Sequence, residues 1–329
     1  MSSNSFPVTR RSALLGTLGA GAALAAAGLP GRPAHAAAPM LGPTKPSVYR
    51  FKLGAYEVTT ILDGAIQLDG PHPIFGNNQK PEDVQKLAAE NFLPGNRMAI
   101  SFAPVVVNTG SELILFDAGN GAGRRPNAGA LRALLGSAGY TPDQIDVVVL
   151  THFHPDHIGG LSEDGKPAFP NARYVTGQAE YDFWSPAEKA SGPTERVGKL
   201  VQSHVVPLAG RMSFLKDGGT VASGITAVAS FGHTPGHMAF HIESDGKRLM
   251  VTADVANHYV ISLQRPDWHV GFDMDKDKAA AARKSVFGMI AADKIPFTGY
   301  HMPFPNVGYV EPMGGGFRYV AAGYQMDLG

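Results

Sequence analysis

The sequence predicts an α/β protein in which helices cover β-sheets, and three observations support this fold class. Apolar runs typical of strands alternate along the chain with longer helical segments. No linker-like stretch divides the chain after its first segment, so we expect a single domain over residues 37–329. Hydrophobic residues make up 44% of the sequence, which is enough to stabilise one large domain by burial alone.

Residues 1–36 read as a signal peptide of the twin-arginine type. Arg10 and Arg11 precede an Ala/Gly/Leu-rich run over residues 13–29, and the small-residue pattern Ala34-His35-Ala36 follows. The apolar run is shorter than the ~20 residues of a membrane span and is diluted with glycine. We therefore expect cleavage near Ala36, no stable membrane insertion afterwards, and a periplasmic or secreted protein.

The remaining elements follow from the periodicity of apolar residues. Strands are expected at residues 48–54 and 56–64, 104–110 and 111–119, 146–152, 171–177, 225–230, 238–244, 247–254 and 294–301. Helices are expected at residues 81–92, 130–139, 178–184, 194–205 and 277–292.

Charge and cysteine content exclude several classes of function. The formal net charge is zero, and loss of the three arginines of the signal peptide leaves it near −3, so nothing favours nucleic acid as a partner. The chain contains no cysteine. Disulfides, cysteine-ligated zinc and iron–sulfur clusters are therefore excluded.

The stretch THFHPDHIGG, residues 151–160, concentrates potential metal ligands. It places His152, His154, Asp156 and His157 within six positions. With this composition, such a pattern arises by chance in roughly one chain in a thousand. The stretch also begins where a predicted strand ends, and three other predicted strands lead into His233, Asp254 and His301. Ligands at strand ends suit a rigid metal site.

The spacing inside this stretch indicates two ions. His152 and His154 are two residues apart on extended chain and face one side, whereas the chain turns after Pro155. Glycines at 159 and 160 allow close backbone approach in this turn. We expect the turn to direct Asp156 and His157 toward a second ion. Adding His233 to the first pair gives the three imidazoles of a catalytic zinc site. His301 completes the second set, and Asp254 remains as a carboxylate able to bridge.

These motifs, together with G-H-T-P-G-H at residues 232–237, resemble the metallo-β-lactamase superfamily. The resemblance covers essentially all of the mature chain and is strongest to methyl parathion hydrolases and related lactonases and aryl esterases. It implies an αβ/βα sandwich of two mixed sheets flanked by helices, with the metal site along the edge between the sheets.

The resemblance also implies the ligands and their roles. His152, His154 and His233 would hold one ion, Asp156, His157 and His301 the other, with Asp254 between them. We expect two divalent ions, zinc first, with manganese, cobalt or iron as alternatives. Asp156 and Asp254 are the predicted catalytic carboxylates, and Asp254 is a candidate proton shuttle to the leaving group.

Several neighbouring residues carry open alternatives. His237 is expected to support the site rather than bind metal, while Asp63 and Asp117 are equally compatible with a site role and with ordinary turns. Asn257 occupies the position where many lactonases of this fold have a tyrosine, so an oxyanion-stabilising group would have to come from elsewhere. Members of this superfamily often form dimers, so a homodimer is also open.

An aromatic wall is expected for the substrate pocket. Its predicted members are Phe183, Trp184, His258, Trp268 and Phe304, with Tyr259 nearby. Arg124 and Arg125 are either solvated charges or a feature that favours a substrate with an acidic group.

The leading hypothesis is a dinuclear metallo-hydrolase in which a metal-bridging hydroxide attacks a small-molecule ester, lactone or phosphotriester of the methyl parathion type. An acyl-homoserine-lactone lactonase is the first alternative. A mononuclear-iron redox enzyme of the same fold is the alternative from another class.

Overall fold

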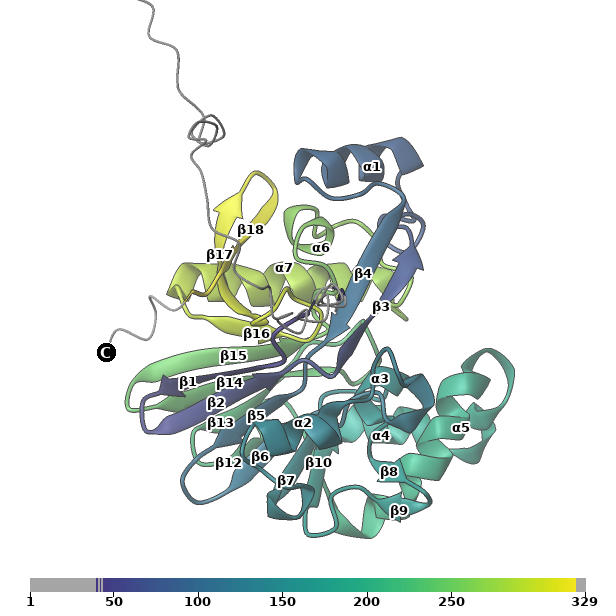
Figure 1. The fold of residues 1–329 in the computed structure, drawn as a ribbon. Helices are drawn as coiled ribbons and strands as arrows, with labels where there is room; N and C mark the ends of the chain where they lie inside the picture. The colour runs from purple at the N-terminus through teal and green to yellow at the C-terminus, as the bar shows by residue number, and fades with distance from the viewer. Residues whose placement is uncertain (1–39, 41, 43, 324–329) are drawn as a thin grey trace, which may run out of the picture. The chain divides into compact units, whose positions relative to one another are not determined.

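A computed structural model describes residues 40, 42 and 44–323, and residues 45–323 belong to one compact unit (Figure 1). The predicted signal peptide lies outside the described residues. Among the residues that are described, no helix is both long and apolar enough to cross a membrane.

Two seven-stranded sheets form the centre of this unit. The first sheet runs in the order β1 (Val48–Leu53), β2 (Tyr56–Ile61), β5 (Val105–Asn108), β6 (Leu113–Phe116), β7 (Val147–Leu150), β10 (Arg173–Gly177) and β11 (Met212–Leu215). The second runs in the order β12 (Thr220–Ala222), β13 (Ile225–Ala229), β14 (Met238–Ser244), β15 (Lys247–Ala253), β16 (Phe297–Gly299), β17 (Val307–Met313) and β18 (Gly316–Ala321). Both are mixed, since β6–β7–β10–β11 and β15–β16 pair in parallel and the other neighbours antiparallel.

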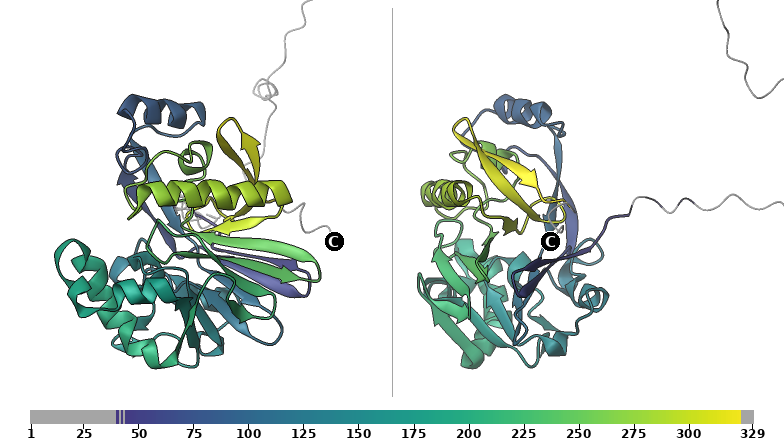
Figure 2. Two further views of the ribbon diagram at one scale, coloured as in Figure 1. Left: turned by 180° about the vertical axis from the view of Figure 1, so that it is seen from behind. Right: turned by 90° about the vertical axis from the view of Figure 1, so that its left-hand side faces the viewer.

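Helices cover the outer faces of both sheets, as the views from the front and from behind show (Figure 1 and Figure 2, left). The helices of the described residues are α1 (Pro81–Glu90), α2 (Leu131–Ser137), α3 (Pro155–Ile158), α4 (Gln178–Trp184), α5 (Glu195–His204), α6 (Ile261–Gln264) and α7 (Lys276–Asp293). Of these, α2, α4, α5 and α7 cover the sheets, whereas α1 packs against α6. In Figure 2, α7 lies along the second sheet, while α4 and α5 lie beside the first.

The alternation of side chains along the strands produces three stacked cores. Val147 and Val149 of β7 face the second sheet and meet residues such as Phe240 of β14. Val148 and Leu150 face the other way, into the core that α2, α4 and α5 cover. A third core lies between the second sheet and α7. This arrangement confirms the predicted sandwich of two mixed sheets flanked by helices.

Three strand pairs were not expected from the sequence, and the first of them lines the cavity at the site. β3 (Gly64–Asp69) and β4 (Arg97–Phe102) pair antiparallel as a separate ribbon, although 27 residues including α1 separate them. The strands β17 and β18 close the second sheet after the last predicted strand. A small ribbon of β8 (Ser162–Glu163) and β9 (Lys166–Pro167) follows the histidine-rich stretch.

Candidate metal centre

The predicted ligands meet where strands of both sheets end. His152 and His154 follow β7, whereas Asp254 follows β15 of the second sheet directly. The potential ligand atoms form two groups, and within each group all of them lie within 4.8 Å of one another. The first group is His152, His154, His233 and Asp254, and the second is Asp156, His157 and His301. The sequence predicts two such sets with Asp254 between them, whereas here the Asp254 carboxylate groups with the first three histidines. The assignment of these side chains as ligands stays a prediction.

The carboxylate of Asp254 lies between the two groups. Its Oδ2 is 3.2 Å from His233 Nε2 and 3.0 Å from His301 Nε2. Its Oδ1 is 3.3 Å from Nε2 of His157, which belongs to the second group. Asp254 is therefore placed to contact ions in both positions, as a bridging ligand requires.

Buried nitrogens without partners fit a pair of cations. Nε2 of His152, of His157 and of His233 is buried and has no hydrogen-bond partner, and the same is true of Asp254 Oδ1. Leaving such atoms dry and unpaired costs about 1–3 kcal/mol each. A divalent ion satisfies a neutral imidazole nitrogen and a carboxylate oxygen together, so the donor set is suited to metal.

Hydrogen bonds on the opposite ring nitrogens hold the imidazoles in place. His157 Nδ1 lies 2.8 Å from Asp117 Oδ2, and His301 Nδ1 donates to a backbone carbonyl, that of Ser101. His233 Nδ1 lies 2.8 Å from Asp273 Oδ1. Such partners orient the ring and keep Nε2 free to bind.

Asp117 and Asp63 separate into different roles. Asp117 contacts His157 and accepts hydrogen bonds from the backbone and hydroxyl of Thr151, so it supports the histidine-rich stretch. Asp63 instead accepts from backbone N–H groups of Asn120, Gly129 and Leu131. Its role is to hold the loop before α2, as an ordinary turn residue does.

His237 supports Asp254 through the backbone. Its Nε2 accepts the N–H of Asp254 at 3.1 Å, and its Nδ1 lies 2.8 Å from Ser230 Oγ. Burial lowers the pKa of His237 to about 3, which keeps the ring neutral and able to accept. Ala253, which directly precedes Asp254, has φ 44°, a strained conformation for a residue with a Cβ.

Sequence reasoning missed Glu180, which joins the two motifs. This buried carboxylate on α4 accepts from the N–H of Phe153 at 2.9 Å, between two predicted ligands. Its other oxygen accepts from Thr234 Oγ1 at 2.7 Å and from the N–H of Gly236 at 2.9 Å. A Cβ on Gly236 would lie 2.0 Å from the backbone nitrogen of Glu180, which explains the glycine. The helix carries two acidic residues, Glu180 and Asp182, and the local sequence did not show which of them is buried.

A second missed pair is Asp273 and Arg283. Arg283 of α7 is completely buried and bonds Asp273 Oδ2 at 2.9 Å, while Asp273 Oδ1 faces His233. The arginine also donates to the carbonyls of Val255 and Pro266. An arginine in an alanine-rich helix was the signal, and it could not identify its partner.

Asn257 and Tyr300 complete the surroundings. Asn257 Nδ2 donates to Asp254 Oδ2 at 2.9 Å, so the residue at the lactonase tyrosine position fixes the central carboxylate. Tyr300 stacks on His157 with ring centroids 3.9 Å apart and donates its hydroxyl to the carbonyl of Asp156 at 2.6 Å.

Electrostatic shifts follow from the close packing of imidazoles and carboxylates. Burial lowers the pKa of His152 and His154 well below the ordinary range, with the neighbouring imidazoles adding to the effect. Burial opposes protonation of His233, but the carboxylates of Asp254 and Asp273 outweigh it and raise its pKa to about 9. The protein thus concentrates negative charge around Asp254, where cations would be held.

A cavity of about 530 Å³ opens onto the cluster. His154, Asp156, Asp254 and His301 form its floor. Its other lining residues are Ile66, Leu68, Ile100 and Phe102 of the β3–β4 ribbon, Pro155, Val197, Gly271 and Phe272, and the two arginines Arg124 and Arg196. A largely apolar wall above a polar floor is the usual form of a small-molecule site.

The five aromatic residues predicted for this pocket do not line it. Trp184 is buried in the core under α4, and Phe183 packs against that core with Lys189 over its ring. Trp268 packs beside Phe75. Phe304 is half-buried in the turn after His301 and absent from the lining. The correction has one cause: the unpredicted β3–β4 ribbon supplies the apolar wall.

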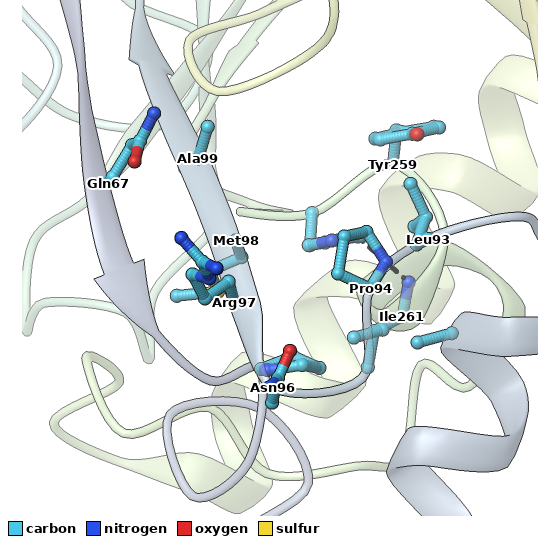
Figure 3. A pocket seen from close by; sticks show the side chains of 12 residues that line it. Gln67, Leu93, Pro94, Asn96, Arg97, Met98, Ala99, Tyr259 and Ile261 are labelled. Atoms are coloured by element: carbon cyan, nitrogen blue, oxygen red, sulfur yellow. Dashed lines mark hydrogen bonds between the residues drawn. The ribbon is translucent and has the colours of Figure 1, made fainter.

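His258, the fifth, lines a separate cavity of about 580 Å³. Figure 3 shows this cavity between β4 and α6, with Gln67, Arg97 and Met98 on one side and Tyr259 and Ile261 on the other. Its lining contains none of the predicted metal ligands.

Comparison with known proteins identifies the family. Residues 103–293 match the model of the "Metallo-beta-lactamase superfamily". The chain belongs to this superfamily. The probable metallo-hydrolase YflN of Bacillus subtilis (strain 168) is 27% identical over 178 residues, which cover 47% of this chain and 67% of YflN.

Two solved structures resemble most of the chain. One is AidC, a dizinc quorum-quenching lactonase in complex with a product N-hexnoyl-L-homoserine, with 26% identity, a TM-score of 0.77, and coverage of 84% of this chain and 98% of AidC. The other is the hydrolase AbOPH, with 25% identity, a TM-score of 0.78, and coverage of 85% and 99%. The prediction of a metallo-hydrolase is confirmed, while the particular resemblance to methyl parathion hydrolases stays a prediction.

Proposed function

We propose that this protein is a dinuclear metal-dependent hydrolase that acts on esters or lactones, with phosphotriesters as a third substrate class. The observation that carries the proposal is the pair of ligand groups sharing the carboxylate of Asp254. In a mononuclear-iron enzyme, the group of Asp156, His157 and His301 would have no ion to bind.

Among the three bond types, the comparisons favour lactones. AidC is a dizinc lactonase, and it shares 26% of its residues with this chain over nearly its whole length. The apolar wall of the β3–β4 ribbon is suited to the acyl part of such a substrate. Zinc is accordingly the first candidate for both ions, and a quorum-quenching activity on acyl-homoserine lactones is the narrower alternative.

The residues of the chain divide the chemical work. Divalent ions held by the two groups would lower the pKa of a bound water and polarise the substrate's carbonyl or phosphoryl oxygen. Asn257 and His237 fix the side chain and the backbone of Asp254, so its carboxylate keeps one orientation. Asp254 faces the cavity and is assigned to pass a proton to the leaving group. The apolar residues of the β3–β4 ribbon form the wall above the ligand groups.

Metal content and turnover together test the proposal. Elemental mass spectrometry should find about two ions per chain, and turnover of an aryl ester, a lactone and a phosphotriester should be lost on chelation and return with Zn²⁺. The ratio of the three rates identifies the preferred bond. One iron per chain without hydrolysis would refute the proposal and favour redox chemistry.

A substitution separates the assigned proton transfer from metal binding. Asp254→Asn should lower turnover while part of the metal remains bound. Full turnover with both metals retained would remove the proton role from Asp254. We also propose that the enzyme acts outside the cytoplasm, which detection of processed protein in a periplasmic fraction would test.

A further inference from the structure

Two arginines lie at the cavity above the metal cluster. Arg124 belongs to the short helical turn Ala122–Arg124 before α2, and Arg196 lies in the first turn of α5. Both line the same cavity as His154, Asp156 and His301. The helix α5 packs against α3, which carries Asp156, so the first turn of α5 is held beside the site.

Neither guanidinium has an acidic partner among the described residues, whereas neighbouring arginines do. Arg125 and Arg132 both bind the carboxylate of Glu163. Arg124 also borders the hollow that contains Glu163, but that carboxylate already has its two partners. Instead, the guanidinium of Arg124 lies over the ring of Phe102, 5.9 Å from its centroid, which holds it at the cavity wall.

The acidic residues of the cavity do not compensate these charges. They are Asp156 and Asp254, and both belong to the predicted ligand groups. If they bind cations, the remaining charged groups of the lining are the two arginines. Arg124 is half-buried and Arg196 is exposed, so both guanidinium groups can reach an anion in the cavity, with the strength of exposed charge pairs.

We propose that Arg124 and Arg196 form a subsite for a carboxylate at the end of the substrate remote from the bond that is cleaved. The substrate class is then a half-ester, or a lactone with an acidic side chain, whose apolar segment lies along the β3–β4 ribbon. This inference rests on the proposed hydrolase function and adds the charge of its substrate. Guanidinium groups suit carboxylates because both are planar and bind through paired hydrogen bonds.

A matched pair of esters tests the subsite. The probes are the mono-4-nitrophenyl esters of adipic and suberic acid and their neutral methyl esters, which differ only at the remote end. The wild-type protein should favour the anionic member about tenfold in kcat/KM, since each exposed charge pair contributes up to about fivefold. The preference should shrink at 0.5 M NaCl because salt screens exposed charges.

Neighbouring arginines provide the control. Arg124→Gln and Arg196→Gln should each reduce the preference severalfold, and the double variant should abolish it. The readout is the ratio of kcat/KM for the anionic and the neutral ester, so a general change in rate that affects both esters cancels. Arg125→Gln removes the same charge one residue away from a side chain that binds Glu163, and it should keep the preference.

The outcomes separate the subsite from the proposed function. Equal rates on both esters, or a preference that survives in the double variant, would overturn the subsite while leaving the hydrolase intact. If no ester, lactone or phosphotriester is hydrolysed, the proposed function fails. Calorimetric titration with adipate then decides the subsite alone: affinity about tenfold weaker in the double variant than in the Arg125→Gln control supports it, and equal affinity refutes it.

Discussion

Replacing Glu180 by glutamine should weaken the fold and metal binding together. The buried carboxylate receives three hydrogen bonds, one from Phe153 on one oxygen and two, from Thr234 and Gly236, on the other. Glutamine has nearly the same shape but only one accepting oxygen. Whichever way its amide turns, at least one donor of the protein faces an NH₂ group.

The expected cost follows from these contacts. The better orientation keeps the Thr234 and Gly236 bonds and leaves the N–H of Phe153 buried without an acceptor, which costs about 1–3 kcal/mol. The two remaining bonds become weaker if the wild-type carboxylate is charged, because charge-assisted bonds are roughly twice as strong as neutral ones. We therefore expect a loss of about 2–4 kcal/mol in the free energy of unfolding.

Urea unfolding of the metal-free protein measures this loss, and zinc titration against a chromophoric chelator measures the second effect. Because Phe153 lies between His152 and His154, affinity at the first group should fall about 10–100-fold. Asp182→Asn on the exposed side of α4 is the control, and it should change neither quantity. A Glu180→Gln protein within 0.5 kcal/mol of the wild type, with unchanged zinc affinity, would refute the reasoning.

Three further predictions concern neighbours of the site. Asp273→Asn should lower zinc affinity about 10–100-fold in the same titration, because His233 loses its charged partner; affinity like that of Asp277→Asn, an exposed control, would contradict this. Asn257→Ala should lower kcat about tenfold with metal content unchanged, since Asp254 loses an orienting bond; an unaltered kcat would show that the bond is dispensable. Burial lowers the pKa of His258 to about 4 from 6.5, so its contribution to stability is complete above pH 6.5 and is lost as pH falls toward 4. His258→Asn, which can accept the same backbone bonds, should therefore flatten the fall of unfolding free energy across that window by up to ~3 kcal/mol, and parallel curves would exclude the effect.

The elements that could be predicted are those with a clear pattern in the local sequence. The buried strand of Val147 to Leu150 is a continuous β-branched and aliphatic run, and His152 follows it after a single residue, so both the strand and the position of the ligand could be recognised. The β3–β4 ribbon has no such signal, because its two strands pair across α1 and only one face of each is apolar. Since that ribbon forms the cavity wall, the pocket residues could not be predicted correctly without it.

The supporting contacts were hidden for a related reason. Asp117 and His157 are 40 residues apart, and Glu180 and Gly236 are 56 apart, so nothing in the local sequence connects them. Ligand types are visible in a motif because a metal requires particular side chains at short spacing. The partners that orient those ligands need only one acceptor at the right point in space, and many residues in the chain could supply it.

Each of the two ligand groups contains residues from both sheets, so bound metals would also have a structural role. His152, His154 and Asp156 leave from the first sheet, while His233, Asp254 and His301 leave from the second, so each ion would tie the two layers together as a cross-link. Loss of the ions would weaken the contact between the two sheets and also end turnover. The rate of metal dissociation would then set the rate at which the enzyme is inactivated, and resistance to proteolysis would be lost at the same rate.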